Sequence, residues 1–457
     1  MLTVGDIIEG TAGTLVAARA GEGSTFTRGI IDSREAAEGD LFFALRGEHH
    51  DAHEFVPAAF ASGAAGAVVA RPIEANGHAV FHVSDPLAAL QRLAAFWRRR
   101  HDVRVVGVTG SVGKTTCKEL TAAVLASRYR TLKSEANQNT EIGIPLTLLR
   151  MTEEHQRAVL ELGMYVPGDI ELLSQISAPD VGIVTNVGPV HMERVGTIGQ
   201  IAAGKAELVE ALPADGLAVL NGDDPRVTVM ARWTRARSLL FGLSEQCDVR
   251  GSDIESHGLD GISFTITHEG KTVRARCPLP GRHHVYPALA ATAVALGEGM
   301  TLEETAAALA EARADQRLTV RAGINGCTII DDSYNASPAS MTAALDLLSE
   351  LPGRRIAVLG HMRELGAAEE DGHRAVGRYA PGRCDLLYVV GDDARTIAEE
   401  ARAAGLDAQL IASAKEAAER LRGQLREGDH VLVKASRAVG LESLVAALVS
   451  ESNGMPG

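Results

Sequence analysis

The chain has 457 residues, of which 46% are hydrophobic and 4% are aromatic, and it contains 47 glycines. This length exceeds what one hydrophobic core usually supports, and the composition is typical of α/β proteins, so we expect two or three α/β domains. The formal net charge of −14 argues against nucleic acid or an anionic membrane as a partner. A phosphate site would therefore have to be made by local loops and a metal ion.

Cysteine usage and hydropathy indicate a cytoplasmic protein. The five cysteines are far apart in the sequence and include no C-x-x-C pair, which fits a reducing compartment. The N-terminus has no basic stretch followed by an apolar one, and no apolar run has membrane-spanning length. We therefore expect no insertion into a membrane.

Residues 1–84 mix short apolar runs with turns and are predicted to form a small α/β module. Strands are expected at residues 30–31 and 41–45, and a helix at residues 55–62. A further helix is expected at residues 87–100. It ends in Arg98, Arg99 and Arg100, which we interpret as a solvated helix end favoured by the helix dipole.

Residues 103–129 carry the central motif of the chain. A run of valines is followed by a glycine-containing loop and then by apolar residues at helical spacing, which predicts a strand, a loop and a helix. In such a loop the backbone N–H groups point at a phosphate, a lysine reaches the β- and γ-phosphates, and a threonine binds Mg²⁺. A glycine turn that binds nothing is the alternative, but the flanking strand and helix favour a nucleotide site. The loop comprises Gly110, Ser111, Val112, Gly113, Lys114, Thr115 and Thr116.

Two further apolar strands, expected at residues 159–163 and 181–186, end in polar residues. Because ligands bind at the carboxyl ends of parallel strands, we expect Glu161, Asn186 and the nearby His191 beside the glycine loop. A carboxylate and an imidazole there are suitable ligands for Mg²⁺. Taken singly, however, a glutamate at a strand end is more often a solvated or capping residue.

The second half of the chain shows two patterns. Alternating apolar residues between 262 and 277 predict a β-hairpin on the flank of the nucleotide domain, and Thr301 with Glu304 predicts the start of a helix. From about residue 316, strands and helices alternate strictly, which predicts a second parallel sheet of Rossmann type. Its strands are expected at residues 328–331, 355–359, 386–390, 409–412 and 431–434, and its helices include residues 339–351, 394–404, 414–425 and 441–449.

Four blocks of sequence resemble those of the Mur ligase family, and together they span nearly the whole chain. The last two blocks are especially specific for the branch that joins D-alanyl-D-alanine to UDP-N-acetylmuramoyl-tripeptide. The family's phosphate loop, T-G-x-x-G-K-T, matches here from Thr109 to Thr115. The blocks are residues 32–34 with 39–42, residues 109–116, residues 139–149, and residues 331–335 followed by Pro338.

The resemblance implies three domains and an ATP-dependent reaction. Residues 1–84 would hold the UDP moiety, residues 85–315 would form the central P-loop ATPase, and residues 316–457 would form a Rossmann-like domain that brings the incoming amine. Such ligases transfer the γ-phosphoryl group of ATP to the substrate's terminal carboxylate, and an amine then attacks the acyl phosphate to give an amide. Because anionic groups must be brought together, the site needs Mg²⁺ and fixed cations.

The resemblance also assigns roles to individual residues. The catalytic residues would be Lys114, Glu161, His191 and Lys205. The metal ligands would be Thr115, Glu161, His191 and the N-carbamate of Lys205. Without the resemblance, Lys205 would be interpreted as a surface lysine paired with Glu207 or Glu210.

The remaining assignments concern the nucleotide and the substrates. The nucleotide would contact the glycine loop and Asn139, and also Arg317 and Asp332 once the domains close. The substrates would contact Ser33, Arg34 and Asn335. The C-terminal side of the cleft would also include Lys434 and Ser436.

The chain departs from the family at several positions. The family has two asparagines near adenine at the start of a helix, and here His284 and Pro287 replace them, which leaves base recognition open. His361 stands where the branch commonly has aspartate, and Ala52 stands where a glycine is usual.

Two other functions stay open. A sister ligase that adds a single amino acid is one, and the block at residues 331–335 weighs against it. A nucleotide-binding regulator without ligase activity is the other, and such a protein would not need Glu161, His191 and Lys205 together. We expect a monomer, and the sequence leaves open whether the third residue of the tripeptide is diaminopimelate or lysine.

Overall fold

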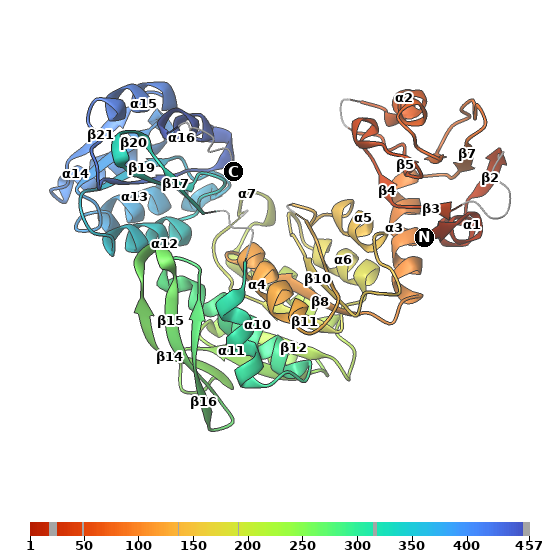
Figure 1. The fold of residues 1–457 in the computed structure, drawn as a ribbon, viewed down its shortest axis with the longest axis horizontal. Helices are drawn as coiled ribbons and strands as arrows, with labels where there is room; N and C mark the ends of the chain where they lie inside the picture. The colour runs from red at the N-terminus through yellow and green to blue at the C-terminus, as the bar shows by residue number, and fades with distance from the viewer. Residues whose placement is uncertain (18–24, 48–49, 136, 191, 314–317, 451–457) are drawn as a thin grey trace, which may run out of the picture.

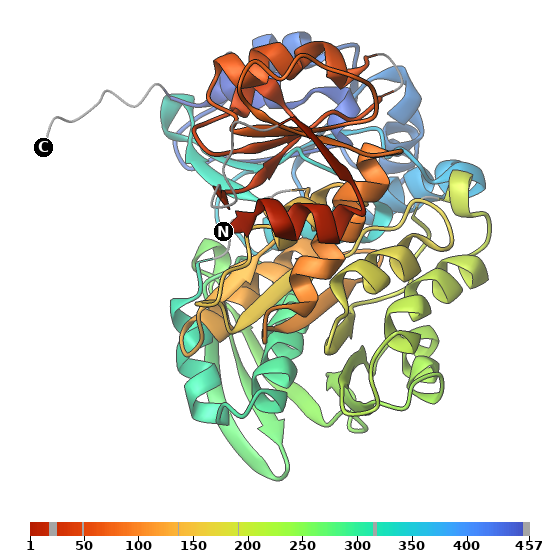
Figure 2. The ribbon, with the colours of Figure 1, turned by 90° about the vertical axis from the view of Figure 1, so that its right-hand side faces the viewer.

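The computed structural model describes residues 1–17, 25–47, 50–135, 137–190, 192–313 and 318–450. Three main sheets, each covered by helices, follow one another along the chain (Figure 1). The N-terminal and C-terminal parts both lie above the central part when the molecule is turned (Figure 2). The central sheet therefore forms the base of a crescent, and this arrangement confirms the predicted α/β fold class.

The N-terminal part contains a five-stranded sheet in the order β2-β7-β6-β5-β4, which is parallel except for β2. The predicted helix at residues 55–62 is α2 (Val56–Ala61), preceded by a 3₁₀ turn. Helix α1 (Val4–Thr11) and a short pair of strands, β1 (Leu2–Thr3) with β3 (Thr25–Phe26), complete this part. The sheet strands are β2 (Thr14–Ala17), β4 (Gly29–Ile30), β5 (Leu41–Phe43), β6 (Gly66–Val69) and β7 (Ala79–His82).

The central sheet has nine strands in the order β16-β15-β14-β13-β12-β11-β8-β10-β9. Strands β9 to β14 are parallel, and the predicted hairpin β15–β16 extends the sheet with antiparallel pairing. The strands are β8 (Arg104–Thr109), β9 (Thr131–Lys133), β10 (Arg157–Glu161), β11 (Val181–Val184), β12 (Leu217–Asn221), β13 (Arg237–Gly242), β14 (Val249–Ser256), β15 (Ile262–His268) and β16 (Lys271–Cys277).

Both faces of the central sheet are buried, as expected for parallel strands. In β8, Val105 faces one hydrophobic core whereas Val106 and Val108 face the other. The first core is covered by α3 (Pro86–Arg99), α5 (Gly143–Leu148), α6 (Asp169–Ser177) and α8 (Ile198–Glu210). The second is covered by α4 (Lys114–Ala126), α10 (Val285–Gly297) and α11 (Leu302–Glu311), and short helices α7 (Met192–Val195) and α9 (Pro225–Thr228) lie in connections.

The C-terminal sheet has the order β17-β18-β22-β19-β20-β21 and is parallel except for β17. The sequence analysis missed β17, because its side chains are largely exposed and leave no apolar pattern. The strands are β17 (Thr319–Ala322), β18 (Thr328–Asp332), β19 (Arg355–Gly360), β20 (Leu386–Val390), β21 (Ala408–Ile411) and β22 (His430–Lys434). The helices are α12 (Pro338–Ser349), α13 (Glu369–Tyr379) and α14 (Arg395–Ala403) on one face, with α15 (Ala414–Arg422) and α16 (Glu442–Leu448) on the other.

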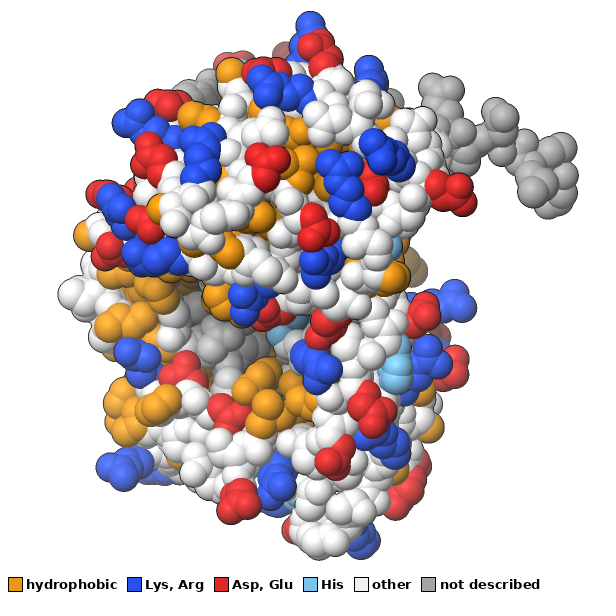
Figure 3. All heavy atoms as spheres, turned by 90° about the vertical axis from the view of Figure 1, so that its left-hand side faces the viewer, with side chains coloured by type: hydrophobic (Ala, Val, Ile, Leu, Met, Phe, Trp, Pro, Cys, Tyr) orange, Lys and Arg blue, Asp and Glu red, His pale blue; other side chains and the backbone are white. Residues whose placement is uncertain are grey.

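On the face in Figure 3, the described basic and acidic side chains are interspersed and form no continuous basic surface. None of the helices in the described part of the chain is long and apolar enough to cross a membrane. The boundaries proposed near residues 84 and 315 stay predictions.

The prediction that the three arginines at the end of α3 are solvated is wrong for Arg98. Its side chain is buried, and its guanidinium donates to the carbonyl oxygens of Ser177, Ala178 and His101. It also pairs with the carboxylate of Asp180 at 3.1 Å. Arg98 therefore ties α3 to the loop that follows α6.

Replacing Arg98 by alanine should lower the free energy of unfolding by about 3 kcal/mol, because it leaves a carboxylate and three carbonyl oxygens without their donor. Urea unfolding followed by tryptophan fluorescence would measure the change. Arg99→Ala is the matched control, because within the described part of the chain that exposed side chain donates only to the carbonyl oxygen of Ala95, and it should change stability by less than about 0.5 kcal/mol. Equal effects of the two substitutions would contradict this role for Arg98.

Candidate active site

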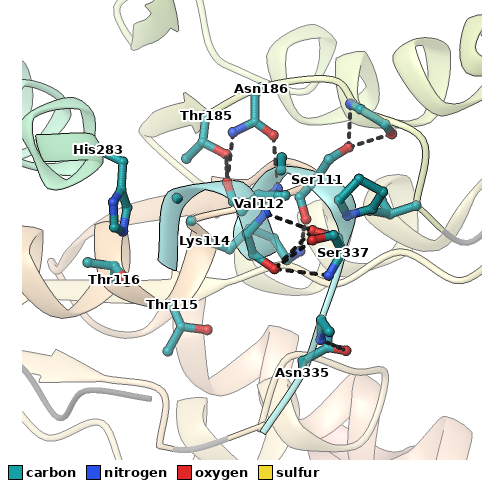
Figure 4. A pocket seen from close by; sticks show the side chains of 18 of the residues that line it. Ser111, Val112, Lys114, Thr115, Thr116, Thr185, Asn186, His283, Asn335 and Ser337 are labelled. Carbon is teal, nitrogen blue, oxygen red and sulfur yellow. Dashed lines mark hydrogen bonds between the residues drawn. The ribbon is translucent and has the colours of Figure 1, made fainter. Parts of the chain in front are cut away.

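A cavity of about 690 Å³ lies between the central and C-terminal sheets. Its central wall consists of the glycine loop, the segment after β11 and the start of α10, at the carboxyl ends of the parallel strands. Its C-terminal wall consists of segments that follow β18, β19 and β22. Figure 4 shows Asn335 and Ser337 of the C-terminal wall across from Lys114 and Ser111 of the loop. Two sheets thus present their carboxyl ends to one cavity, which is where α/β proteins bind ligands.

The glycine loop has a defined conformation that neighbouring segments hold in place. Gly113 has φ +83° and is the N-cap of α4, while Gly110 has φ +149°, and a side chain there would overlap the hydroxyl of Thr185. The amide of Asn186 clamps Val112, since its Oδ1 accepts from the backbone N–H at 2.9 Å and its Nδ2 donates to the carbonyl. The loop is therefore preformed around the N-terminus of α4, where anions bind favourably.

Lys114 is folded back over this loop. Its Nζ donates to the carbonyl oxygens of Gly110 at 2.9 Å and Ser111 at 3.3 Å. This places a cation at the mouth of the loop, where the sequence predicted that it would meet phosphate.

Glu161 lies at the end of β10 with only 1% of its surface exposed. Its Oε2 accepts from the hydroxyl of Thr115 at 2.7 Å, and its Oε1 accepts from Nδ2 of Asn139 at 3.0 Å. The structure thus brings together three predicted site residues from α4, β10 and the loop before α5. These hydrogen bonds hold the carboxylate beside the first turn of α4.

The donor set around Glu161 fits a magnesium ion better than a transition metal. The described residues contain no group of three His, Cys, Asp or Glu side chains that could hold a metal. Mg²⁺, however, is usually bound by one or two carboxylates together with substrate phosphates and water. A buried carboxylate and a threonine hydroxyl next to a phosphate loop meet this requirement. His191, the third predicted ligand, lies outside the described residues.

Lys205 is in α8 and is 2% exposed, so the interpretation as a surface lysine is wrong. Glu207, its suggested partner, instead accepts from the backbone N–H groups of Gly168 and Glu171. Burial lowers the pKa of Lys205 well below its ordinary value, and the nearby charge of Lys114 lowers it further. The amine is therefore held in an environment that favours its neutral form.

The C-terminal wall carries a buried ion pair. Lys434, at the end of β22, is 2% exposed, and its Nζ lies 2.6 Å from Oδ2 of Asp332 at the end of β18. The same ammonium donates to the carbonyl oxygen of Asn335 at 2.9 Å. Asp332, Asn335 and Lys434 line the cavity, whereas Arg317 lies outside the described residues.

The start of α10 forms another side of the cavity, and here the family asparagines are absent. His284 lines the cavity, and its Nδ1 lies 2.7 Å from the carbonyl oxygen of Pro280. Burial, followed by the proximity of His283, lowers the pKa of His284 well below its ordinary value. The ring is therefore neutral and donates through Nδ1 to Pro280, which leaves Nε2 as a hydrogen-bond acceptor.

Sequence reasoning missed several residues on this side of the cavity. Asn221 ends β12 and Phe241 lies near the end of β13, and both line the cavity together with Tyr286. The hydroxyl of Tyr286 donates to the carboxylate of Asp223 at 3.0 Å. The rule that placed Glu161 at the carboxyl end of a parallel strand also applies to Asn221 and could have identified it.

Other predicted residues do not line this cavity. Ser33 and Arg34 lie in the N-terminal part, where Arg34 is exposed and its side-chain hydrogen bond to Asp32 is the main cause that lowers the pKa of that carboxyl to about 2. His361 pairs with Glu369 at 3.0 Å and stacks on His373 within the C-terminal part. The substrate roles of Ser33 and Arg34 stay predictions.

Comparison with known proteins gives two family matches. The model of the Mur ligase middle domain matches residues 108–295. The model described as Mur ligase, glutamate ligase domain matches residues 316–437. Together the two matches include the glycine loop, Glu161, Lys205 and the Asp332–Lys434 pair.

Curated relatives and solved structures extend the similarity to nearly the full chain. UDP-N-acetylmuramoyl-tripeptide–D-alanyl-D-alanine ligase of Synechocystis is 38% identical, covering 92% of this chain and 91% of that protein. The Bacillus subtilis protein of the same name is 36% identical over 98% of both chains. A crystal structure of MurF from Acinetobacter baumannii has a TM-score of 0.87 and 31% identity over 97% of this chain and 98% of that one. MurF ligase from Thermotoga maritima, solved in complex with ADP, has a TM-score of 0.80 and 30% identity over 92% of this chain and 96% of that one.

Proposed function

The chain belongs to the Mur ligase family, and we propose that it joins D-alanyl-D-alanine to UDP-N-acetylmuramoyl-tripeptide at the expense of ATP. The observation that best supports this proposal is that Thr115 and Asn139 both bond to Glu161 beside Lys114. These residues lie at a cavity whose opposite wall is formed by the C-terminal part. The reaction is the formation of a C–N bond, with transfer of the γ-phosphoryl group to the tripeptide carboxylate before the amine attacks.

The glycine loop would bind the phosphates of ATP through its backbone N–H groups and the N-terminus of α4. Lys114 would exchange its carbonyl partners in the loop for phosphate oxygens and would offset the charge on the transferred group. Because the loop is already clamped by Asn186, little reorganisation would accompany nucleotide binding. The Thr115–Glu161 pair would hold Mg²⁺, which when bound would neutralise phosphate charge and polarise the phosphoryl group.

The C-terminal wall would bring the dipeptide to the activated carboxylate and keep water out. Asp332 and Lys434 neutralise each other, so this pair adds no net charge that would repel the amine or bind it too far from the acyl phosphate. A cavity enclosed by two sheets also protects an acyl phosphate from hydrolysis. The position of Asn335 on the same wall supports its proposed contact with substrate.

His284 would recognise the base of ATP. Its Nε2 is an acceptor, because Nδ1 is committed to Pro280. An acceptor at this position matches the exocyclic amino group of adenine and repels the carbonyl oxygen of guanine. The loss of the family asparagines is therefore compatible with ATP as the nucleotide.

The two alternatives receive less support. The curated relatives across nearly the full length are D-alanyl-D-alanine ligases, which disfavours a sister enzyme that adds one amino acid. A regulator that only binds nucleotide would not require a buried Lys205 behind the phosphate loop. Both observations favour an active D-alanyl-D-alanine ligase over the two alternatives.

The proposal is tested by incubating the protein with ATP, Mg²⁺, UDP-N-acetylmuramoyl-tripeptide and D-alanyl-D-alanine and detecting the pentapeptide product by mass. Lys114→Ala should reduce turnover by at least about 100-fold without loss of fold, because it removes charge stabilisation in the transition state. Lys271→Ala, which changes an exposed lysine in the distant hairpin, should leave turnover unchanged. Absence of product from the wild-type protein would overturn the proposal.

Lys205 is proposed to act as an N-carbamate that supplies oxygen ligands to Mg²⁺. Its lowered pKa favours the neutral amine that reacts with CO₂, and a hard cation prefers the resulting oxygens to an ammonium. Lys205→Ala should therefore bind ATP but turn over roughly 10- to 100-fold more slowly, and added formate or acetate should partly restore the rate.

Bicarbonate depletion offers an independent check of the carbamate, because it should slow the wild-type enzyme and leave Lys205→Ala unaffected. The rates with and without added bicarbonate would be compared for both proteins. Full activity of Lys205→Ala would show that this lysine has no part in the reaction.

A further inference from the structure

Another buried lysine lies one helical turn beyond Lys114, and the proposed reaction does not use it. Lys118 points from α4 toward the end of β9, and its side chain is fully buried. Lysine is almost never fully buried unless its charge is paired, because removing an ammonium from water is costly. The partners of Lys118 should therefore reveal why a cation is placed here.

Lys118 has two partners. Its Nζ donates to the carbonyl oxygen of Ser134 at 2.7 Å and lies 2.8 Å from Oε1 of Glu119. The other oxygen of Glu119 is 2.5 Å from Nζ of Lys133, the last residue of β9. The ammonium of Lys118 is thus neutralised by its neighbour and ties α4 to the residue that follows β9.

Ser134 in turn contacts the backbone of Glu161. Strand pairing between β9 and β10 ends with Lys133 opposite Val159. Beyond that point the hydroxyl oxygen of Ser134 accepts from the backbone N–H of Glu161 at 3.1 Å, and Ser134 is 1% exposed. Ser134 therefore accepts a hydrogen bond from Lys118 through its carbonyl oxygen and another from the backbone N–H of Glu161 through its hydroxyl oxygen.

We propose that Lys118 is a positioning residue for the metal site, acting through Ser134 to fix the carboxylate of Glu161 against Thr115 and Asn139. Lys114, Thr115 and Lys118 all project from the first turns of α4. The helix that forms the phosphate site thus also holds, through a buried cation, the residue that accepts a hydrogen bond from the backbone of Glu161. Ligands held by buried polar neighbours are oriented in advance, and loss of such a neighbour typically weakens metal binding by 10- to 100-fold.

The structure indicates why a long cation is used here. The backbone N–H of Ser134 donates to the carbonyl oxygen of Val159 at 3.1 Å, which ties this residue to β10, and the ammonium of Lys118 ties it to α4. A neutral side chain would leave a buried carbonyl oxygen and the Glu119 carboxylate without this donor, and the link between Ser134 and α4 would be lost. A charged hydrogen bond is roughly twice as strong as a neutral one, so it holds the carbonyl group of Ser134 more firmly.

This inference rests on the proposed function, and its test measures metal binding directly. Mn²⁺ would be titrated calorimetrically into the full-length protein saturated with a non-hydrolysable ATP analogue. Lys118→Met should weaken the Mn²⁺ affinity by about tenfold or more. In the ligase assay the same variant should need a higher Mg²⁺ concentration for half-maximal rate, while its KM for the UDP substrate should stay within about twofold of the wild-type value.

Ser134→Ala should produce the same loss of Mn²⁺ affinity, because it removes the acceptor for the Glu161 N–H, whereas Ser134→Thr should retain the affinity of the wild type. These variants decide the question if Lys118→Met does not fold. Arg98→Ala is the control for the general loss of a buried cation, since Arg98 also binds carbonyl oxygens but lies at the far end of the strands. It should lower stability and leave the Mn²⁺ affinity unchanged.

The possible outcomes are distinct. Wild-type Mn²⁺ affinity in folded Lys118→Met or in Ser134→Ala would overturn the positioning role. An equal loss of affinity in Arg98→Ala would also overturn it, because the effect would then be general destabilisation. A wild-type protein that binds Mn²⁺ and the analogue but yields no pentapeptide would count against the proposed function alone.

Discussion

Repulsion between the reacting groups is the constraint on which this structure depends. The proposed reaction brings a carboxylate up to a nucleoside triphosphate, and a protein with a net charge of −14 offers no general positive field to assist it. The cations and dipoles that overcome this repulsion must be local. The chain supplies them at one point, where the N-terminus of α4, Lys114 and the proposed metal site at Glu161 meet at the end of the central sheet.

Rigid support behind these groups is as important as the groups themselves. Asn186 clamps the glycine loop from the segment after β11, and Ser134 holds the backbone of Glu161 from the segment after β9. The opposite wall is held by the buried pair of Lys434 and Asp332. Electrostatic stabilisation is effective only when the charges are oriented before the reaction begins, and each of these contacts orients one part of the cavity.

The predictions that succeeded used short-range patterns. The strand, loop and helix around Lys114 follow from local periodicity, and the placement of Glu161 follows from a rule about the ends of parallel strands. The predictions that failed include one about a residue whose partner lies far away in the sequence. Arg98 meets Asp180 only after the sheet has formed, so the sequence around Arg98 could not reveal that its side chain is buried. Strand β17 was missed because an exposed edge strand needs no apolar alternation.

Some assignments rest on the family and not on the geometry. His191 and Arg317 lie outside the described residues, and the contacts of Ser33 and Arg34 with substrate stay predictions. By contrast, the family motif left base recognition open, and the hydrogen bond between His284 and Pro280 is the basis of the proposal that His284 recognises adenine. The geometry of single residues is thus most informative about function at positions where this sequence departs from its relatives.

The central claim is that the tripeptide carboxylate is phosphorylated before the amide bond forms. The most direct test uses UDP-N-acetylmuramoyl-tripeptide labelled with ¹⁸O in its terminal carboxylate, together with unlabelled ATP and D-alanyl-D-alanine. Transfer through an acyl phosphate should place one ¹⁸O atom from the carboxylate in the released inorganic phosphate, which mass spectrometry would detect. Release of unlabelled phosphate together with pentapeptide product would contradict the account.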